Sequence, residues 1–192
     1  MTAKHLCAGE RTETATLQHP WTNDGTPAQQ ILTRVGALDA KGDVAAFTLE
    51  PRSLNGVVGE VPLDSGDMVY SQEAFILGYP YGLSFQVGGG GQQLPLVKRG
   101  IVSGSLRGED DEEIHVLDTI ANPGFSGGPM VFFPPGSDQP KFAGVVKGNI
   151  TAPFAEPTPD QPNPPHTTAG LSYVTGSASV RGLGGIQLTG LR

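Results

Sequence analysis

One serine in the sequence has neighbours that suit nucleophilic chemistry. Ser126 lies in the stretch Asn122-Pro-Gly-Phe-Ser-Gly-Gly-Pro129. A serine hydroxyl is a weak nucleophile by itself, so it needs a base within hydrogen-bond reach. The flanking glycines allow a backbone turn in which the N–H groups of Gly124 and Ser126 point at one spot. Such a spot stabilises the oxyanion that forms when a serine attacks a carbonyl group. The stretch therefore predicts acyl transfer with Ser126 as the nucleophile.

Two hydrolase arrangements fit this serine, and chain order distinguishes them. The motif Gly-x-Ser-x-Gly is also the elbow of esterases of the α/β-hydrolase type, in which a helix follows the serine and the acid and histidine come later. Here glycines and prolines follow Ser126, and the one later histidine, His166, lies in a proline-rich loop. The other arrangement has histidine, aspartate and serine in that order. We favour this second order and keep an esterase as an alternative.

His5 and Asp43 supply the two earlier members of that order. His5 stands in Thr2-Ala-Lys-His-Leu-Cys7, and Asp43 follows 38 positions later, directly before Val-Ala-Ala-Phe47. His5 would act as the general base for Ser126, and Asp43 would hold the imidazole in the productive tautomer. Either residue alone is typical of a surface or turn position. Their order ahead of Ser126 predicts a catalytic triad.

These segments resemble the motifs of trypsin-like serine proteases. The residues around His5 are similar to the Thr-Ala-Ala-His-Cys signature of that family, and Asp43 begins a segment similar to its Asp-(Ile/Val)-Ala strand. The segments 74–82, 97–104, 142–146 and 170–174 resemble strands of the bacterial high-temperature-requirement branch. The resemblance implies a double β-barrel that cleaves peptide bonds through an acyl-enzyme. No metal ion or other cofactor is expected.

The resemblance also implies a pocket for the side chain before the cleaved bond. Its base corresponds to Ile120, six residues before Ser126. The remaining pocket positions are Val146, Lys147 and Gly148. An apolar base favours a small or medium apolar side chain over lysine or arginine.

Short strands are the elements that must position these residues. The chain has 28 glycines and 17 prolines but only 16% charged residues, which is typical of an all-β protein. Helical periodicity is weak and occurs at 3–11 and 176–182. We therefore expect an all-β, chymotrypsin-like double β-barrel with a short C-terminal helix. Predicted strands cover 45–49, 74–78, 97–102, 115–119, 130–133, 142–146 and 170–174.

The 192 residues are expected to form one peptidase domain of two parts. Residues 1–66 would make a partial first barrel, and residues 67–192 a second barrel with a proline-rich loop at 153–165. Four residues precede His5, where the family has one or more strands, so the first barrel is expected to be N-terminally truncated. The chain is then a fragment or a natural short form. The short form leaves an alternative function, a catalytically impaired protease-like domain that binds peptides or proteins.

Charge and composition limit the partners. The net charge of −7 argues against nucleic acid, and no apolar run is long enough to cross a membrane. The single cysteine, Cys7, allows no intrachain disulfide. The expected partner is a peptide or protein substrate, and homo-oligomerisation is left open. The chain as written carries no signal peptide, which indicates the cytoplasm, or export if an N-terminal segment is missing. The compartment is therefore unknown.

Overall fold

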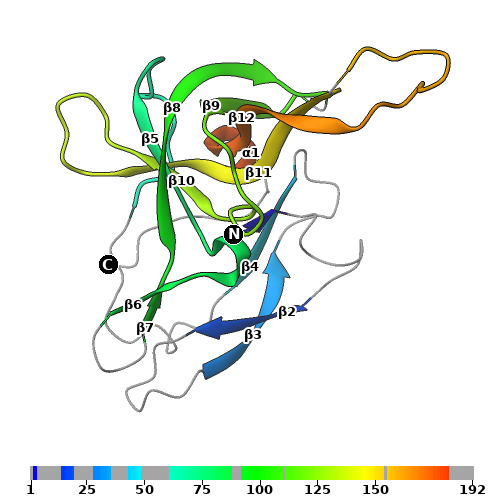
Figure 1. Ribbon diagram of the computed structural model, residues 1–192. Helices are drawn as coiled ribbons and strands as arrows, with labels where there is room; N and C mark the ends of the chain where they lie inside the picture. Colours follow the sequence, from blue (N-terminus) through cyan, green and yellow to red (C-terminus); the bar gives the residue numbers. More distant parts are fainter. Residues whose placement is uncertain are drawn as a thin grey trace.

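In the computed structural model of the chain, the regular secondary structure of the described residues is almost wholly β-strand (Figure 1). The structure describes residues 2–3, 14–19, 28–35, 43–48, 61–87, 92–109, 111–153 and 155–181. The all-β class and the short helix near the C-terminus are confirmed. The elements are β1 (Thr2–Ala3), β2 (Thr14–His19), β3 (Ala28–Val35), β4 (Val44–Thr48), β5 (Glu73–Gly78), the 3₁₀ turn η3 (Pro80–Gly82), β6 (Phe85–Val87), β7 (Gln92–Leu94), β8 (Leu96–Arg107), β9 (Glu113–Asp118), β10 (Pro129–Phe132), β11 (Lys141–Pro153), β12 (His166–Gly176) and α1 (Ser177–Arg181).

Six strands close into an antiparallel barrel in the order β10-β11-β12-β9-β8-β5. Each apolar run predicted after residue 70 overlaps one of these strands, and the runs 115–119 and 130–133 extend one residue beyond β9 and β10. The strands β11 and β12 are longer than predicted, because their ladder continues to the pair Pro153 and His166. This extension projects from the barrel as a ribbon, and the described part of the proline-rich loop, residues 155–165, forms its tip (Figure 1).

The residues before the barrel form a four-stranded sheet in the order β1-β4-β3-β2. The described part of the chain thus holds one closed barrel, this open sheet and a two-stranded sheet of β6 and β7. Ala3 pairs with Val44 in the four-stranded sheet. A helix was predicted over residues 3–11, but Ala3 lies in a strand, because pairing with β4 satisfies its backbone hydrogen bonds. The rest of that segment lies outside the described residues. The strands β2 and β3 mix polar and apolar residues, so neither has an apolar run long enough to predict it from.

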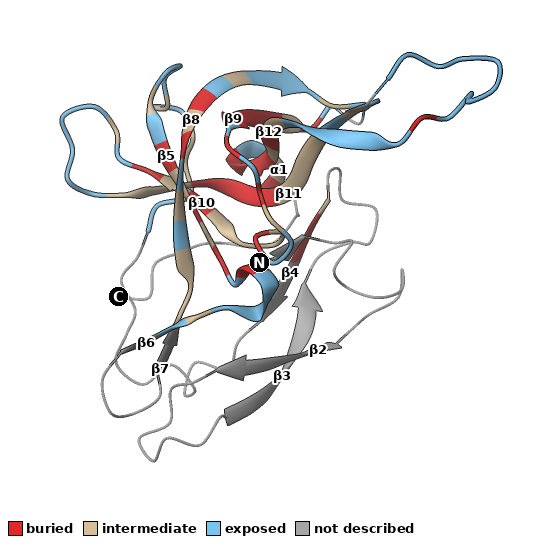
Figure 2. Ribbon diagram, viewed as in Figure 1, coloured by how far each residue is buried: buried red, intermediate tan, exposed pale blue. Residues whose placement is uncertain are grey.

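Inward-facing side chains of the barrel strands make the main core. Buried residues are concentrated in these strands (Figure 2). Fully burying one such apolar side chain contributes about 1.5–3 kcal/mol. A second, smaller cluster joins Val44 of β4, Val145 on β11 and Val180 of α1, so β4 packs against the barrel. The main core consists of Ala74, Ile76, Val102, Leu117, Ala121, Phe125, Met130, Phe132, Ala143, Val146 and Val174.

Glycines allow the end of β5 to touch the loop between β9 and β10. A Cβ on Gly78 would lie 2.6 Å from the carbonyl oxygen of Gly124 and 2.8 Å from the Cα of Phe125. A Cβ on Gly128 would overlap the carbonyl oxygen of Leu77. The two segments therefore meet backbone to backbone, and any side chain at these positions would separate them.

We predict that Gly78→Ala destabilises the protein by about 1–3 kcal/mol, because the new methyl group meets backbone atoms that have little room to move. Gly104→Ala is the matched control, since a Cβ at Gly104 meets nothing within 4 Å. It should change the free energy of unfolding by less than about 1 kcal/mol. Urea denaturation of the two variants and the wild type measures both effects. Equal stability of the two variants would contradict the prediction.

A buried histidine of β9 lies close to residues that contact α1. The Nδ1 of His115 is 2.9 Å from the hydroxyl of Ser105, and its Nε2 is 3.7 Å from the carboxylate of Glu113, too far for a hydrogen bond. The Glu113 carboxylate accepts the N–H of Ala178 at the start of α1. Burial lowers the pKa of His115 below its ordinary 6.5, and the charge of Glu113 opposes this shift.

Stability should therefore decrease as the pH falls below about 6.5. Unfolded His115 takes up a proton there, whereas the folded side chain stays neutral to lower pH. The free energy of unfolding should fall by up to about 1.4 kcal/mol per pH unit below 6.5 from this group. His115→Gln should remove that part of the slope in urea titrations between about pH 7 and pH 5. His166→Gln, at an exposed position of β12, should keep it. An unchanged slope in His115→Gln would refute the assignment.

Candidate active site

The loop that carries Ser126 is built from two consecutive tight turns. The N–H of Phe125 donates to the carbonyl of Asn122 at 3.0 Å, and the N–H of Gly128 donates to the carbonyl of Phe125 at 2.9 Å. Gly124 and Gly127 have φ values of 104° and 84°, a left-handed region that favours glycine. The ring of Phe125 is buried in the barrel core and anchors the loop. We call residues 122–128 the nucleophile loop.

One side of the nucleophile loop is bonded to β11. The N–H of Gly127 donates to the carbonyl of Val146 at 2.8 Å, and the N–H of Val146 donates to the carbonyl of Gly128 at 2.9 Å. The hydroxyl of Ser126 donates to the carbonyl of Lys147 at 3.1 Å. Ser126 is half-buried, so its hydroxyl lies at the edge of the barrel and not in its core.

The other side of the loop is bonded to the segment around η3. The N–H groups of Tyr79 and Tyr81 donate to the carbonyls of Gly124 and Pro123, both at 2.9 Å. Within the described residues, the N–H groups of Gly124 and Ser126 have no hydrogen-bond partner. The carbonyls of the loop are thus held by neighbouring backbone, while these two donors stay available. Two such donors are what an oxyanion hole requires.

The predicted triad is only partly covered by the structure. His5 lies outside the described residues, as does Cys7. Asp43 is half-buried and directly precedes β4. Ala3, two positions before His5, pairs with Val44, the residue after Asp43. Val44 in turn packs with Val145 of β11. The described strands therefore bring the segment before His5 and the segment after Asp43 towards the strand that contacts Ser126.

The four predicted pocket residues differ in where their side chains lie. Val146 is fully buried in the barrel core, so its side chain does not line an open pocket. Ile120 is 37% exposed. The ammonium of Lys147 lies 5.4 Å from the centre of the Tyr173 ring, and Gly148 borders the same ring.

Two residues that the sequence analysis missed hold the backbone beside Ile120. The N–H of Ala121 donates to the Asn149 Oδ1 at 2.7 Å and to the Ser172 hydroxyl at 2.8 Å. The amide nitrogen of Asn149 donates back to the carbonyl of Ala121 at 2.9 Å. Ser172 is fully buried. A polar residue inside an apolar strand run needs such partners, and this signal was present in the sequence of β11 and β12.

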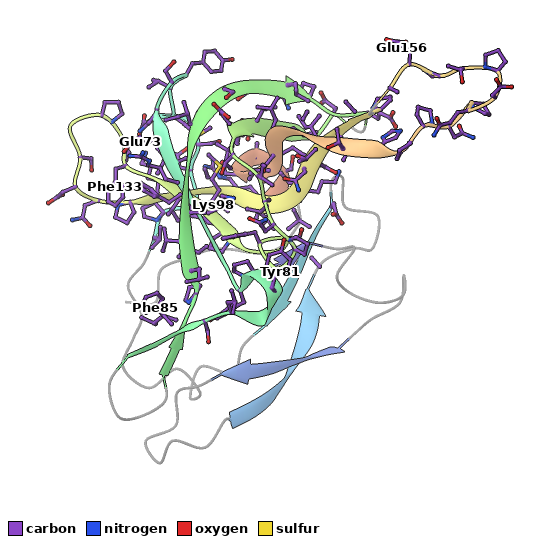
Figure 3. All side chains as sticks on the ribbon, viewed as in Figure 1. Glu73, Tyr81, Phe85, Lys98, Phe133 and Glu156 are labelled. Carbon is purple, nitrogen blue, oxygen red and sulfur yellow. The ribbon has the colours of Figure 1, made fainter. Side chains whose placement is uncertain are left out.

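Two side chains outside the loop and the first residue of the loop form a polar chain that we call the outer clamp: Lys98, Asn122 and Tyr81. The ammonium of Lys98 donates to the carbonyl of Ile120 at 2.5 Å and to the Asn122 side-chain oxygen at 3.0 Å. The Asn122 amide donates to the Tyr81 hydroxyl at 3.3 Å. Figure 3 shows Lys98 and Tyr81 close to this part of the barrel. The clamp ties β8 and η3 to the residues just before Ser126.

Neither a metal site nor a membrane segment is found in the part of the chain that the structure describes. No group of three or more His, Cys, Asp or Glu side chains comes together there. No described helix has the length and apolar character needed to cross a bilayer.

Comparisons with solved structures identify the fold. A variant of the HtrA-type protease AlgW, solved with a tripeptide, has a TM-score of 0.58 and 20% identity, over 94% of this chain and 48% of that one. The Rv3671c protease of M. tuberculosis, in its inactive form, has a TM-score of 0.53 and 20% identity, over 95% and 75%. Deg5 has a TM-score of 0.50 and 23% identity, over 77% and 67%. At these identities the likeness establishes the chymotrypsin-like fold alone.

The chain spans about half the length of the AlgW chain that it matches. A search of curated proteins finds no match. A family model described as a trypsin-like peptidase domain matches residues 1–132, more than two thirds of the chain. This match includes the positions of His5, Asp43 and the nucleophile loop, and it agrees with the barrel described above. The chain therefore belongs to the trypsin-like peptidase domain family, and its fold is similar to that of HtrA-type proteases.

Proposed function

We propose that the chain is a serine endopeptidase that uses Ser126 as its nucleophile, His5 as general base and Asp43 to orient His5. One observation carries the proposal. The nucleophile loop presents a half-buried serine hydroxyl beside two N–H groups, those of Gly124 and Ser126, that have no partner among the described residues. Family membership and the order of the three residues along the chain support it.

The proposed reaction proceeds in two halves. The oxygen of Ser126 attacks the peptide carbonyl carbon while His5 takes the hydroxyl proton, and the carbonyl oxygen becomes an oxyanion that the two N–H groups stabilise. Collapse breaks the carbon–nitrogen bond, and His5 returns the proton to the leaving amine. Water then attacks the acyl-enzyme in the same way, which releases the acid and restores Ser126. One oxyanion-hole donor typically contributes about 3 kcal/mol.

A second function has one observation in its favour. In the described structure the Ser126 hydroxyl donates to the Lys147 carbonyl, so it must turn away from this partner to meet a base. A chain in which that bond persisted would be a protease-like domain that binds peptides without cleaving them. The substitution Ser126→Ala distinguishes the two functions.

We predict that Ser126→Ala abolishes labelling by a fluorophosphonate probe and lowers kcat/KM for peptide hydrolysis by about 10⁴–10⁶-fold. Ser103→Ala, an exposed serine on β8, is the control and should keep both activities. A folded wild-type protein that is neither labelled nor active would exclude the peptidase. If wild type and Ser126→Ala then bind the same peptides equally, the non-catalytic function is the correct one.

Asn149 limits the size of the proposed pocket for the side chain before the cleaved bond. The Asn149 amide bonds both the N–H and the carbonyl of Ala121, next to the proposed pocket base Ile120, so we propose that Asn149 bounds a shallow pocket for a small apolar side chain. Lys147 and Gly148 would contribute mainly backbone, since Lys147 turns its ammonium to Tyr173.

Asn149→Ala should enlarge and loosen this pocket. We expect kcat/KM for peptides with Ala or Val before the cleaved bond to fall relative to peptides with Leu or Phe, so that the ratio changes by about tenfold or more. Asn163→Ala, at an exposed position in the proline-rich loop, should leave the ratio unchanged. A lowered rate with an unchanged ratio would mean that Asn149 supports the loop without shaping the pocket.

A further inference from the structure

We infer that an exposed apolar strip next to the nucleophile loop binds the part of a substrate that follows the cleaved bond. The strip consists of Tyr81, Leu83 and Phe85, and Tyr81 is its specificity-determining residue. The partner it fits is an extended peptide with aromatic or large apolar side chains in its first residues after that bond. This inference rests on the proposed peptidase function and adds a preference that the catalytic residues do not supply.

The three side chains are unusually exposed for their types. Tyr81, Leu83 and Phe85 have exposed fractions of 69%, 58% and 64%. The backbone is extended at Leu83, with φ −74° and ψ 139°, and β6 begins two residues later at Phe85. Exposed apolar side chains next to a candidate site are typical of binding surfaces.

Tyr81 connects the strip directly to the nucleophile loop. Its N–H donates to the carbonyl of Pro123, and its hydroxyl accepts from the Asn122 amide. The ring is therefore tied at both ends to the two residues before Gly124, whose N–H is a proposed oxyanion donor. Pro123 and Gly124 are themselves exposed. Figure 3 shows Tyr81 beside this loop and Phe85 farther along the same segment, at the start of β6.

The backbone of Tyr81 is strained in a way that keeps its ring in place. Its φ of 55° and ψ of 26° lie in the left-handed region, which disfavours any residue with a side chain. Residues held in this region are concentrated at active sites and ligand contacts. Here the strain is maintained by the hydrogen bond to Pro123 and by the turn closed between Gly82 and Tyr79.

The position of the strip determines which part of the substrate it meets. The nucleophile loop lies between β11, which carries the proposed pocket for the residue before the cleaved bond, and the η3 segment. A peptide whose earlier residues lie on the β11 side continues past Ser126 towards Tyr81. From Tyr81 to Phe85 the chain reaches at most about 14 Å, about the length of four extended residues.

The chemistry of the strip selects the side chain. Residues 79–87 carry no charged side chain. An acidic or basic peptide residue would find no opposite charge within this segment, whereas aromatic rings stack on Tyr81 and Phe85 with an energy beyond that of their buried area. The strip therefore favours aromatic over polar residues.

Two quenched peptides test the inference. Both carry Val before the cleaved bond, and they differ only in having Phe-Phe or Ser-Ser directly after it. Wild type should cleave the Phe-Phe peptide with the higher kcat/KM. Tyr81→Ala should lower the ratio of the two values by about 2–12-fold, the range of one aromatic pair. Tyr81→Phe keeps the ring and should keep most of the ratio.

Tyr70→Ala is the matched control. Tyr70 is 67% exposed, almost the same as Tyr81, but it lies in the turn before β5, at the other end of that strand from Gly78. This variant should leave the ratio unchanged. A ratio equal in Tyr81→Ala and wild type, or lowered equally in Tyr70→Ala, overturns the inference.

Failure of the strip and failure of the peptidase are distinguishable. The same two peptides, made fluorescent, are titrated into Ser126→Ala and into Ser126→Ala/Tyr81→Ala. If wild type does not cleave but Ser126→Ala binds the Phe-Phe peptide more tightly, and Tyr81→Ala removes that preference, the strip stands and the peptidase fails. If wild type cleaves both peptides equally well, the peptidase stands and the strip fails. Absence of both cleavage and binding overturns both.

Discussion

Backbone contact between the end of β5 and the nucleophile loop is the constraint on which the site depends. Gly78 and Gly124 lack the Cβ atoms that would hold the two segments apart. Because they meet so closely, the N–H groups of Tyr79 and Tyr81 can take the carbonyls of Gly124 and Pro123. Those carbonyls would otherwise be free to rotate into the place of the N–H groups. The orientation of the proposed oxyanion donors thus depends on the close contact between the end of β5 and the nucleophile loop.

The closed barrel supplies the opposing wall. The strand β11 bonds the loop after Ser126, and Asn149 and Ser172 bond the backbone before it. These polar side chains lie where the barrel is otherwise apolar, so leaving any of them unpaired would be costly. Such a network specifies one arrangement of the residues leading to Ser126. A loop held from both sides keeps its shape without a ligand, which is what preorganised catalysis needs.

The sequence predicted the barrel better than the sheet before it. Apolar runs such as those of β5 and β10 are short, bounded by turn residues, and lie in strands as expected. The strands β2 and β3 mix Thr and Gln with scattered apolar residues, so their pairing depends on neighbours that no local pattern reveals. The nucleophile loop was recognisable because its chemistry demands glycines. The burial of Val146 was not, because both faces of β11 are covered there: Val145 packs in the smaller cluster and Val146 in the main core.

The segment from Tyr81 to Phe85 combines a left-handed tyrosine with exposed apolar side chains, and it lies next to the nucleophile loop. A left-handed tyrosine costs about 1–2 kcal/mol relative to a glycine. Three exposed apolar side chains add a risk of association, which the net charge of −7 counteracts by mutual repulsion between molecules. Most apolar side chains of the barrel strands face inward and form the main core, whereas Val97 and Leu106 of β8 are exposed as well. Violations such as those from Tyr81 to Phe85 are expected where function requires them. Their position beside the proposed oxyanion donors is best explained by contact with a substrate, since the barrel itself gains nothing from an exposed aromatic strip.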